Sequence, residues 1–150
     1  MYIVYTDGSY QSSIDAGGYA AVILKDGKVV KKLFKGFKGT TNNRMELMGV
    51  LAALQYFKEP TEMTIYSDSC YIVNNYNGGH AKRWFEENDF SKKNLDLWHD
   101  ILDLLSFHKA TLIWVKGHAD NTYNNMCDEL AVSAARFLNI PQDERNNNKH

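Results

Sequence analysis

The segment Tyr2-Ile3-Val4-Tyr5-Thr6-Asp7-Gly8-Ser9 is the most informative part of this sequence. Its first residues are apolar, β-branched and aromatic, which is typical of a buried strand. The run ends on an acidic residue followed by glycine. We therefore predict a central strand that delivers Asp7 to the carboxyl edge of a sheet, where ligands bind in open α/β folds. The alternative is that Asp7-Gly8-Ser9 forms only a tight turn, since Asp-Gly is a common hairpin sequence.

The composition is that of one globular domain. The chain has 150 residues, of which 44% are hydrophobic and 23% are charged, and this length buries a core without disulfides or structural metals. We expect no membrane-spanning segment and no N-terminal leader, and hence a cytoplasmic protein. Cys70 and Cys127 are too few and too far apart for a zinc site or a disulfide framework, which suits a reducing compartment.

The formal net charge of -1 argues against a protein that coats nucleic acid through charge alone. Positive charge is nevertheless concentrated in one short region, where Asp26 is the only acid. Its basic residues are Lys25, Lys28, Lys31, Lys32, Lys35 and Lys38. Two interpretations stay open: a solvated face of a hairpin, or a patch that faces phosphates beside a nucleic-acid site.

The segments after Asp7 predict an α/β architecture. Residues 19–24 and 29–37 predict two strands that follow by short turns, so the first three strands should form an antiparallel meander. Capping residues at 40–43 and apolar residues at helical spacing up to Phe57 predict a helix. A strand over 62–67 comes next, and a right-handed crossover would place it parallel to the first strand.

The second half of the chain continues this pattern. Residues 70–76, 94–107 and 125–138 predict helices, and residues 111–115 predict a fifth strand. Beyond Pro141 the residues are almost all polar and have little to bury. We therefore expect residues 1–140 to form the domain and residues 141–150 to form a polar, disordered tail.

Four acidic residues are predicted to converge at the carboxyl edge of the sheet. Asp7 and Asp68 follow parallel strands. Glu46 lies in or near the first turn of the crossover helix, and Asp128 lies in the opening turn of the last helix. Three simpler interpretations stay open: a turn for Asp7, dipole compensation for Glu46 and a helix N-cap for Asp68.

A cluster of unpaired carboxylates is electrostatically unfavourable, so it usually holds cations. An all-oxygen set of ligands favours Mg²⁺ or Mn²⁺. Two such ions about 4 Å apart are the arrangement used for phosphodiester hydrolysis. His118, in a loop after the fifth strand, could shuttle a proton there or help the product leave. The alternative is a loop histidine with no part in the reaction.

Several segments together resemble the signature motifs of the type 1 ribonuclease H family. In chain order they are Tyr5-Thr6-Asp7-Gly8-Ser9, Thr40-Thr41-Asn42-Asn43-Arg44-Met45-Glu46-Leu47, Tyr66-Ser67-Asp68-Ser69, Trp114-Val115-Lys116-Gly117-His118-Ala119, and Asn125 with Cys127-Asp128-Glu129-Leu130-Ala131. They occur in the family's order from residue 2 to about residue 138, which is far more specific than any single acid. The resemblance implies a ribonuclease H-like α/β fold, with a five-stranded mixed sheet in the order 3-2-1-4-5 flanked by helices.

The family cleaves the RNA strand of RNA-DNA hybrids with Mg²⁺ and leaves 5′-phosphate and 3′-hydroxyl ends. The resemblance therefore implies a sequence-nonspecific endonuclease that acts on hybrids as a monomer. Carried over by position, Asp7, Glu46, Asp68 and Asp128 would be the metal-holding catalytic carboxylates, and His118 would be a mobile auxiliary residue. Two Mg²⁺ ions would be bound in the presence of substrate, with Mn²⁺ as the alternative ion.

The resemblance also implies a set of substrate contacts. Gly8, Ser9 and Asn43 would meet the hybrid in its minor groove, near the RNA 2′-hydroxyls that distinguish RNA from DNA. Thr41 and Asn42 would grip a phosphate of the DNA strand, a natural function for the free amides of a capped helix start.

Two features depart from the family's pattern. Relatives with a basic handle carry a Trp followed by a Lys/Arg-rich run, whereas Trp84, the implied hybrid contact of the handle, precedes the acidic run Glu86-Glu87-Asn88-Asp89. We therefore expect hybrid binding that is weaker and more sensitive to salt than in basic relatives. Cys70 stands where an amide-bearing residue that touches the groove is common.

Two alternatives to this enzyme stay open. The first is a catalytically silent hybrid-binding module of the same fold, and the presence of all four acids argues against it. The second is a related strand-transfer or junction-cutting enzyme of the wider polynucleotidyl transferase fold. Such an enzyme should lack the Thr-Asn-Asn-Arg-Met-Glu and Lys-Gly-His-Ala segments that this chain contains.

Overall fold

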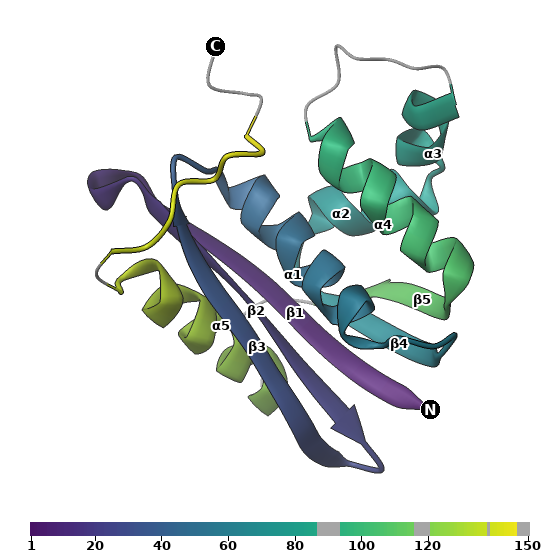
Figure 1. The fold of residues 1–150 in the computed structure, drawn as a ribbon. Helices are drawn as coiled ribbons and strands as arrows, with labels where there is room; N and C mark the ends of the chain where they lie inside the picture. The colour runs from purple at the N-terminus through teal and green to yellow at the C-terminus, as the bar shows by residue number, and fades with distance from the viewer. Residues whose placement is uncertain (87–93, 116–120, 138, 147–150) are drawn as a thin grey trace.

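A five-stranded mixed sheet forms the centre of the molecule, with helices on both of its faces (Figure 1). The computed structural model describes residues 1–86, 94–115, 121–137 and 139–146. The strands are β1 (Tyr2–Gln11), β2 (Ala16–Lys25), β3 (Lys28–Lys38), β4 (Glu62–Ser67) and β5 (Lys109–Trp114). Their order in the sheet is β3-β2-β1-β4-β5, which confirms the predicted order.

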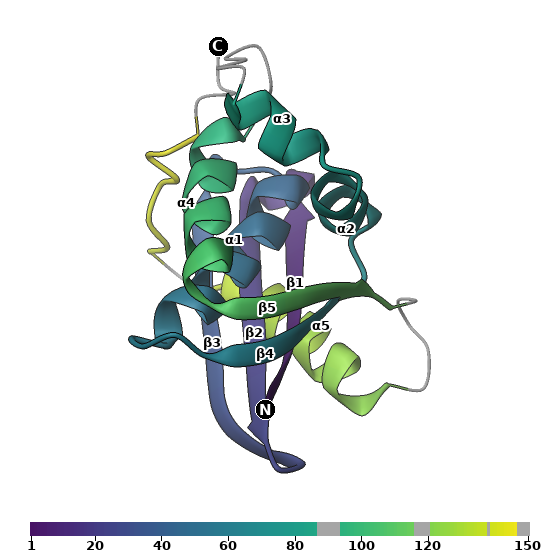
Figure 2. The same cartoon turned by 90° about the vertical axis from the view of Figure 1, so that its right-hand side faces the viewer.

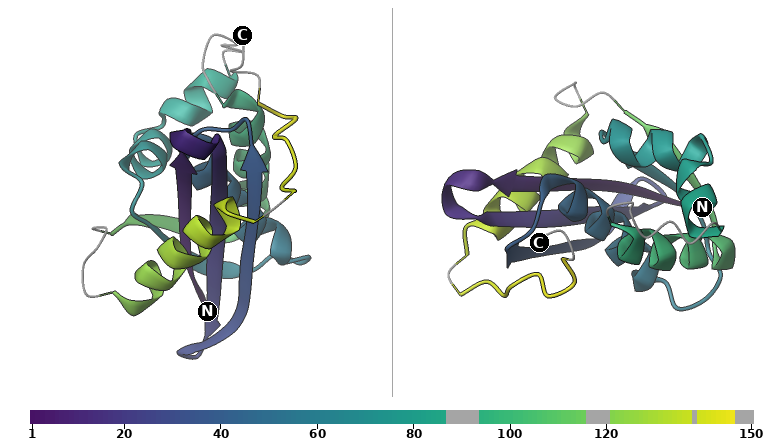
Figure 3. Two further views of the ribbon diagram at one scale, coloured as in Figure 1. Left: turned by 90° about the vertical axis from the view of Figure 1, so that its left-hand side faces the viewer. Right: turned by 90° about the horizontal axis from the view of Figure 1, so that it is seen from above.

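The helices form one layer on each face of the sheet. They are η1 (Ser12–Ile14), α1 (Asn42–Tyr56), α2 (Cys70–Asn77), α3 (His80–Glu86), α4 (Leu95–Phe107) and α5 (Thr122–Ala135). Helix α1 covers one face, with α4 and α2 beside it (Figure 2). Helix α5 crosses β1, β2 and β3 on the opposite face (Figure 3). Within the part of the chain that is described, no helix has the length and apolarity to cross a membrane.

Strand pairing follows the predicted topology. β1 pairs antiparallel with β2 and β2 pairs antiparallel with β3, so the first three strands form the expected meander. β1 pairs in parallel with β4, and β4 pairs in parallel with β5. Two apolar cores result: a larger one between the sheet and α1 with α4, and a smaller one between the sheet and α5.

β1 runs further than its sequence indicated. It continues through Asp7 and Gly8 to Gln11 and pairs with β2 along this whole length, so the tight-turn alternative is wrong. The expectation that the strand ends at Asp7 is also wrong. Asp7 still lies at an edge, because the pairing of β1 with β4 stops at Thr6 opposite Ser67. The shorter neighbour therefore opens the sheet beside Asp7.

Gly8 is where α1 passes closest to β1. A Cβ atom at this position would lie 2.3 Å from the backbone nitrogen of Glu46 and 2.4 Å from the carbonyl carbon of Met45. Only a residue without a side chain allows this approach. The packing of Gly8 under the helix therefore determines how close Glu46 comes to Asp7, the residue before Gly8 on β1.

Residues 141–146 are polar, as expected, but they pack against the domain and are not a disordered tail. Asp143 is only 2% exposed, and Asn146 is also buried. The backbone nitrogen of Lys38 donates to the carbonyl of Pro141, and the nitrogen of Asp143 donates to the carbonyl of Lys38, so the segment pairs with the end of β3. The sequence did not indicate this packing, because these residues are polar and show no apolar pattern. Residues 147–150 lie outside the described residues.

The reason for this packing is the buried guanidinium of Arg44, near the start of α1. Its Nε donates to Asp143 at 2.9 Å, and its other nitrogens donate to Asp96 at 3.0 and 3.1 Å and to Asn94 at 3.2 Å. Thr40 also donates to Asp143. A buried charge is tolerated only when it is paired and hydrogen-bonded. The network therefore ties the start of α1 to α4 and to the C-terminal segment.

The lysine-rich segment lies on the β2–β3 hairpin, and β3 is the edge strand of the sheet. Its six lysine side chains are exposed. Lysine on an edge strand discourages pairing with another chain, because such pairing would bring charges together and desolvate them. This observation favours the solvated-hairpin interpretation, and a phosphate-facing patch stays a prediction.

We expect Gly8→Ala to destabilise the protein by about 3 kcal/mol, because the added Cβ would overlap backbone atoms of α1 that have no free space to retreat into. Urea unfolding followed by circular dichroism measures this difference. Gly27→Asn is the matched control: Gly27 lies on the hairpin with φ +77 and nothing within 4 Å of an added Cβ, and asparagine tolerates this backbone at a cost below about 1 kcal/mol. Equal stabilities for the two variants would contradict the packing argument.

Candidate active site

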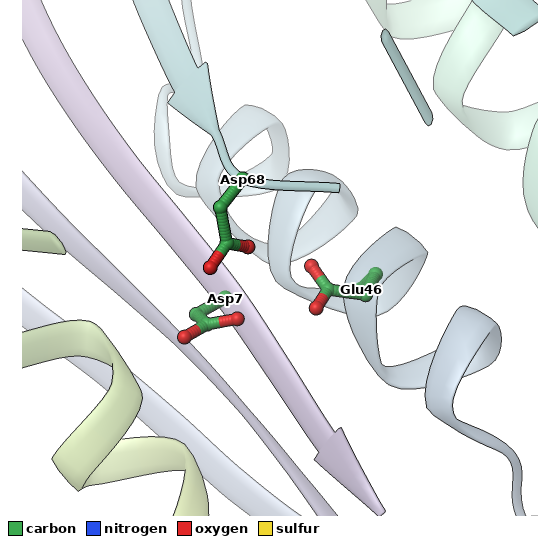
Figure 4. Close-up of side chains that lie close together, drawn as sticks. All are labelled: Asp7, Glu46 and Asp68. Atoms are coloured by element: carbon green, nitrogen blue, oxygen red, sulfur yellow. The ribbon is translucent and has the colours of Figure 1, made fainter. Parts of the chain in front are cut away.

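Three acidic side chains meet beside the end of β4. Asp7 comes from β1, Glu46 from α1, and Asp68 from the turn after β4. One carboxylate oxygen from each lies within 4.8 Å of the others. Figure 4 shows the three carboxylates directed toward one another from these separate elements. The structure therefore brings together three of the four acids that were expected to converge.

The capping alternative for Asp68 is wrong, because the next residue caps α2. The hydroxyl of Ser69 accepts a hydrogen bond from the backbone nitrogen of Ile72. The hydroxyl of Ser67 in turn accepts from the backbone nitrogen of Ser69 at 3.1 Å. These serine bonds hold the turn in which Asp68 lies, so the carboxylate of Asp68 is directed toward the other acids (Figure 4).

The dipole interpretation of Glu46 fails for a similar reason. Thr41 is the N-cap of α1, and its hydroxyl accepts from the backbone nitrogen of Arg44. The helix therefore starts at Asn42, and its first turn contains no acidic residue. Glu46 lies in the next turn, where the attraction of the helix dipole for a carboxylate is weaker.

Asp128 lies deeper in its helix than expected. The side chain of Asn121 accepts from the backbone nitrogens of Tyr123 and Asn124, so α5 begins at Thr122. A helix start near Asn125, with Asp128 in the opening turn, was therefore a wrong prediction, and Asn121 was the signal that was missed. Asp128 is half-buried, and its negative charge helps to raise the pKa of Asp7. Its membership of the acidic group stays a prediction.

Burial and mutual repulsion make the charged form of this cluster costly. Asp7 is 3% exposed and Glu46 is 5% exposed. Burial raises the pKa of Asp7 to about 7, with further contributions from the negative charges of Asp68 and Asp128. Burial also raises the pKa of Glu46 well above its usual value, as do the charges of Asp7 and Asp68. The site therefore favours bound protons or bound cations over free carboxylates.

The donor atoms fit a divalent cation. Asp7 Oδ1 accepts from the backbone nitrogen of Gly8 at 2.8 Å. Asp7 Oδ2 and Glu46 Oε2 are buried and have no hydrogen-bond partner among the described residues. Buried polar atoms without partners are rare, and a cation would satisfy both of them. Hard divalent ions prefer such carboxylate oxygens.

A buried thiol adjoins the cluster. Cys127 on α5 is completely buried, and its Sγ donates to the carbonyl of Tyr5 on β1 at 3.1 Å. Burial, with the nearby negative charge of Asp7, raises the pKa of this thiol. Cys127 therefore stays neutral and fills the space between α5 and β1 without adding charge. In the sequence only its position before Asp128 indicated this place.

The residues implied as substrate contacts lie around the start of α1 and along β1. Asn42 and Asn43 are exposed in the first turn of α1, and Thr41 caps that helix. Ser9 is half-buried on β1. Gly8 is buried beneath α1, so packing alone accounts for glycine at this position.

Two predicted site residues lie, wholly or with their side chains, outside the described part of the structure. His118 lies outside the described residues. Trp84 belongs to α3, but its side chain also lies outside the described part of the chain. Their functions stay predictions.

Comparison with known proteins identifies the family to which this chain belongs. The family model described as RNase H matches residues 1–136. This chain belongs to the RNase H family. A ribonuclease H of Desulforamulus reducens (strain ATCC BAA-1160 / DSM 100696 / MI-1) is 42% identical over 147 residues, which cover 95% of this chain and 92% of that protein. The chain is thus a bacterial-type ribonuclease H, which confirms the predicted family and the prediction of an enzyme.

Solved structures support the RNase H fold. LC9-RNase H1, described as a type 1 RNase H with the type 2 active-site motif, has a TM-score of 0.78 and 26% sequence identity, over 89% of this chain and 71% of that chain. LC11-RNase H1, solved in complex with an RNA/DNA hybrid, has a TM-score of 0.69 and 20% identity, over 90% of this chain and 96% of that chain. The second likeness shows the fold alone.

We expect Mg²⁺ to stabilise this RNase H more at about pH 8 than at about pH 5.5. The pKa of Asp7 is raised from 3.8 to about 7, so without metal the folded protein binds more protons than the unfolded chain between these values. Protonated Asp7 therefore contributes to the stability of the metal-free protein at low pH, and this contribution is lost as the pH rises toward 7. A cation replaces the lost protons. Thermal unfolding with and without Mg²⁺ at the two pH values measures this.

Asp7→Asn provides the control for this experiment. The variant should flatten the loss of metal-free stability with rising pH and should raise stability near pH 8 by roughly 1–3 kcal/mol, because it removes one of the repelling charges. It should also lose most of the Mg²⁺-dependent shift in Tm. An equal Mg²⁺ effect at both pH values in the unchanged protein would contradict this account of the cluster.

Proposed function

We propose that this RNase H is an endonuclease that hydrolyses the RNA strand of RNA-DNA hybrids without sequence preference, leaving 5′-phosphate and 3′-hydroxyl ends. The observation that carries this proposal is the group of Asp7, Glu46 and Asp68, whose carboxylate oxygens lie within 4.8 Å of one another. Relatives named ribonuclease H support the reaction. The match of the RNase H family model to residues 1–136 supports the choice of substrate.

Asp7, Glu46 and Asp68 would hold the divalent ions, with Asp128 as a further ligand from α5. Mg²⁺ is the proposed ion, two per site in the presence of substrate, and Mn²⁺ is the alternative. Two such ions would supply an activated water and stabilise charge on the leaving oxygen. The protein holds the donor oxygens in place: the close packing at Gly8 positions Glu46, and the serine bonds around residue 68 position Asp68.

His118 is proposed to move a proton through its imidazole nitrogen, or to help the product leave. The start of its loop supports this assignment. β5 ends at Trp114, opposite Ser67 at the end of β4, and the nitrogen of Val115 donates to the carbonyl of Ser67. The loop therefore leaves the sheet beside Ser67, the residue that precedes Asp68. Histidine titrates near neutral pH, which suits proton transfer.

The substrate contacts are proposed around the start of α1. Gly8, Ser9 and Asn43 would face the minor groove of the hybrid near the RNA 2′-hydroxyls, which distinguish RNA from DNA. Thr41 and Asn42 would bind a DNA-strand phosphate with help from the free backbone amides of the first helical turn. The capped start of α1 and the exposure of Asn42 and Asn43 support this placement.

Trp84, on α3, is proposed as a further hybrid contact. The acidic residues that follow it should make binding weaker and more sensitive to salt than in basic relatives. The enzyme is proposed to act as a monomer in the cytoplasm. The free thiols of Cys70 and Cys127 suit that reducing compartment.

Asp7→Asn should reduce cleavage of an RNA-DNA hybrid by at least about 10³-fold while the fold stays intact, because a neutral amide is a poor ligand for Mg²⁺. A gel assay that compares RNA-DNA, RNA-RNA and DNA-DNA duplexes with and without Mg²⁺ measures the reaction and its substrate. The unchanged enzyme should cut only the RNA strand of the hybrid.

Asp26→Asn is the matched control for this assay. It makes the same chemical change on the exposed hairpin, at a backbone φ of 52 that asparagine accepts. It should cleave like the unchanged enzyme. Cleavage of the hybrid by Asp7→Asn at the normal rate would refute the assignment of the cluster, and absence of cleavage by the unchanged enzyme would favour a silent binding module.

His118→Ala should slow turnover by about 10- to 100-fold, because it removes the proposed proton shuttle. Its affinity for Mg²⁺, measured by calorimetry, should be the same as that of the unchanged enzyme. An unchanged turnover number would make His118 a loop residue without a part in the reaction.

A further inference from the structure

Trp114 is a large aromatic residue whose position the core does not explain. It is the last residue of β5 and lies opposite Ser67, the last residue of β4. Its side chain is 46% exposed. A tryptophan normally stabilises a protein through burial of its ring, and nearly half of the Trp114 side chain is not buried. The indole therefore needs another reason for its place at this end of the sheet.

The indole N–H of Trp114 donates to the backbone carbonyl of Asp68, with 3.2 Å between the two heavy atoms. This carbonyl lies between two regular elements. The pairing of β4 with its neighbours ends at Ser67, and the cap of α2 begins at Ser69. The bond from Trp114 thus reaches the carbonyl of the Asp68–Ser69 peptide, which connects β4 to α2.

The turn at residues 67–69 is anchored at each of its residues. Ser67 accepts from the nitrogen of Ser69, Ser69 accepts from the nitrogen of Ile72, and Asp68 accepts from Trp114. The two serine bonds are local, within three residues along the chain. The bond from Trp114 is the one of these three that comes from a distant part of the chain, so it ties the Asp68–Ser69 peptide to β5.

We propose that Trp114 is a positioning residue, whose indole N–H holds the peptide of Asp68 so that the Asp68 carboxylate stays within ligand distance of Asp7 and Glu46. This inference rests on the proposed function, in which the three acids hold metal. A rotation of the Asp68 peptide would move its carboxylate away from the other two. The ligands of a metal site have to be held within about 0.5 Å of the geometry that binds the ion. A site therefore loses affinity when the group that holds one ligand in place is removed.

The test is Trp114→Phe, which keeps an aromatic ring and removes the N–H. Groups that orient metal ligands change metal affinity by about 10-fold or more when they are removed, so we expect the Kd for Mg²⁺, measured by calorimetry without hybrid, to rise about 10-fold. The Mg²⁺ concentration for half-maximal cleavage should rise by the same factor. The KM for hybrid at saturating Mg²⁺ should not change, and Tm should fall by no more than about 3 °C.

A second measurement detects the bond directly. In ¹⁵N-labelled enzyme, the indole N–H resonance of Trp114 should move when Mg²⁺ is added to the unchanged protein, because the bonded carbonyl belongs to a metal ligand. The resonance should not move in Asp7→Asn. A Trp114 signal that is the same with and without Mg²⁺ in the unchanged protein would overturn the inference.

Trp98→Phe is the matched control. It removes an indole N–H on α4 that donates to the hydroxyl of Tyr71 at 3.2 Å and not to the turn at residues 67–69. This variant should lower Tm, since Trp98 is completely buried, but should bind Mg²⁺ like the unchanged enzyme. Equal weakening of Mg²⁺ binding by both variants would overturn the inference, because the effect would then be a general loss of stability.

Trp114→Ala separates the bond from the ring. If Trp114→Phe binds Mg²⁺ normally and only Trp114→Ala is impaired, the ring and not the N–H is responsible, and the inference is wrong. The proposed function fails separately: it is wrong if the unchanged protein shows no Mg²⁺ binding that Asp7→Asn abolishes. Normal Mg²⁺ binding that depends on Asp7 but not on Trp114 overturns the positioning inference alone.

Discussion

Helix α1 lies directly against β1 at Gly8, and both the larger core and the acidic cluster need this close approach. Because Gly8 has no Cβ, the backbone of Glu46 passes directly over the strand next to Asp7. Any side chain at this position would push the helix outward and separate the two acids. The same contact seats Met45 and Leu47 in the larger core. The packing that stabilises the domain and the geometry that assembles the site are therefore one arrangement.

This RNase H treats buried charge in two opposite ways. The guanidinium of Arg44 is fully paired with Asp96 and Asp143, as a buried charge requires. Two residues along the same helix, Glu46 faces other acids and burial raises its pKa. The acidic cluster lowers the stability of the protein, whereas the Arg44 network beside it pairs its buried charge. A cluster of unpaired buried charges in an otherwise well-paired structure is typical of a functional site. The paired network holds the start of α1 against the repulsion within the acidic cluster.

The structural roles of single residues, which the sequence left open, depend on hydrogen bonds made by other residues. Asp68 and Ser69 are both good capping residues, and the sequence could not show that Ser69 takes the cap. Asn121 moves the start of α5 forward, so that Asp128 lies in the helix interior. The C-terminal segment was misjudged because its packing depends on one buried partner, Arg44, rather than on an apolar pattern. Each of these outcomes rests on hydrogen bonds that compete locally, which residue preferences rank only weakly.

The order of the strands, the α/β architecture with helices that flank the sheet, and the family could be predicted from the sequence, because strand and helix patterns are local and several motifs occur in a fixed order over most of the chain. The sequence also identified the acids that meet. Three features could not be predicted in this way: β1 runs past Asp7, residues 141–146 pack against α1 and β3, and Trp114 donates to Asp68. These features join residues that are far apart along the chain, and their energies depend on distances and burial that no single segment encodes.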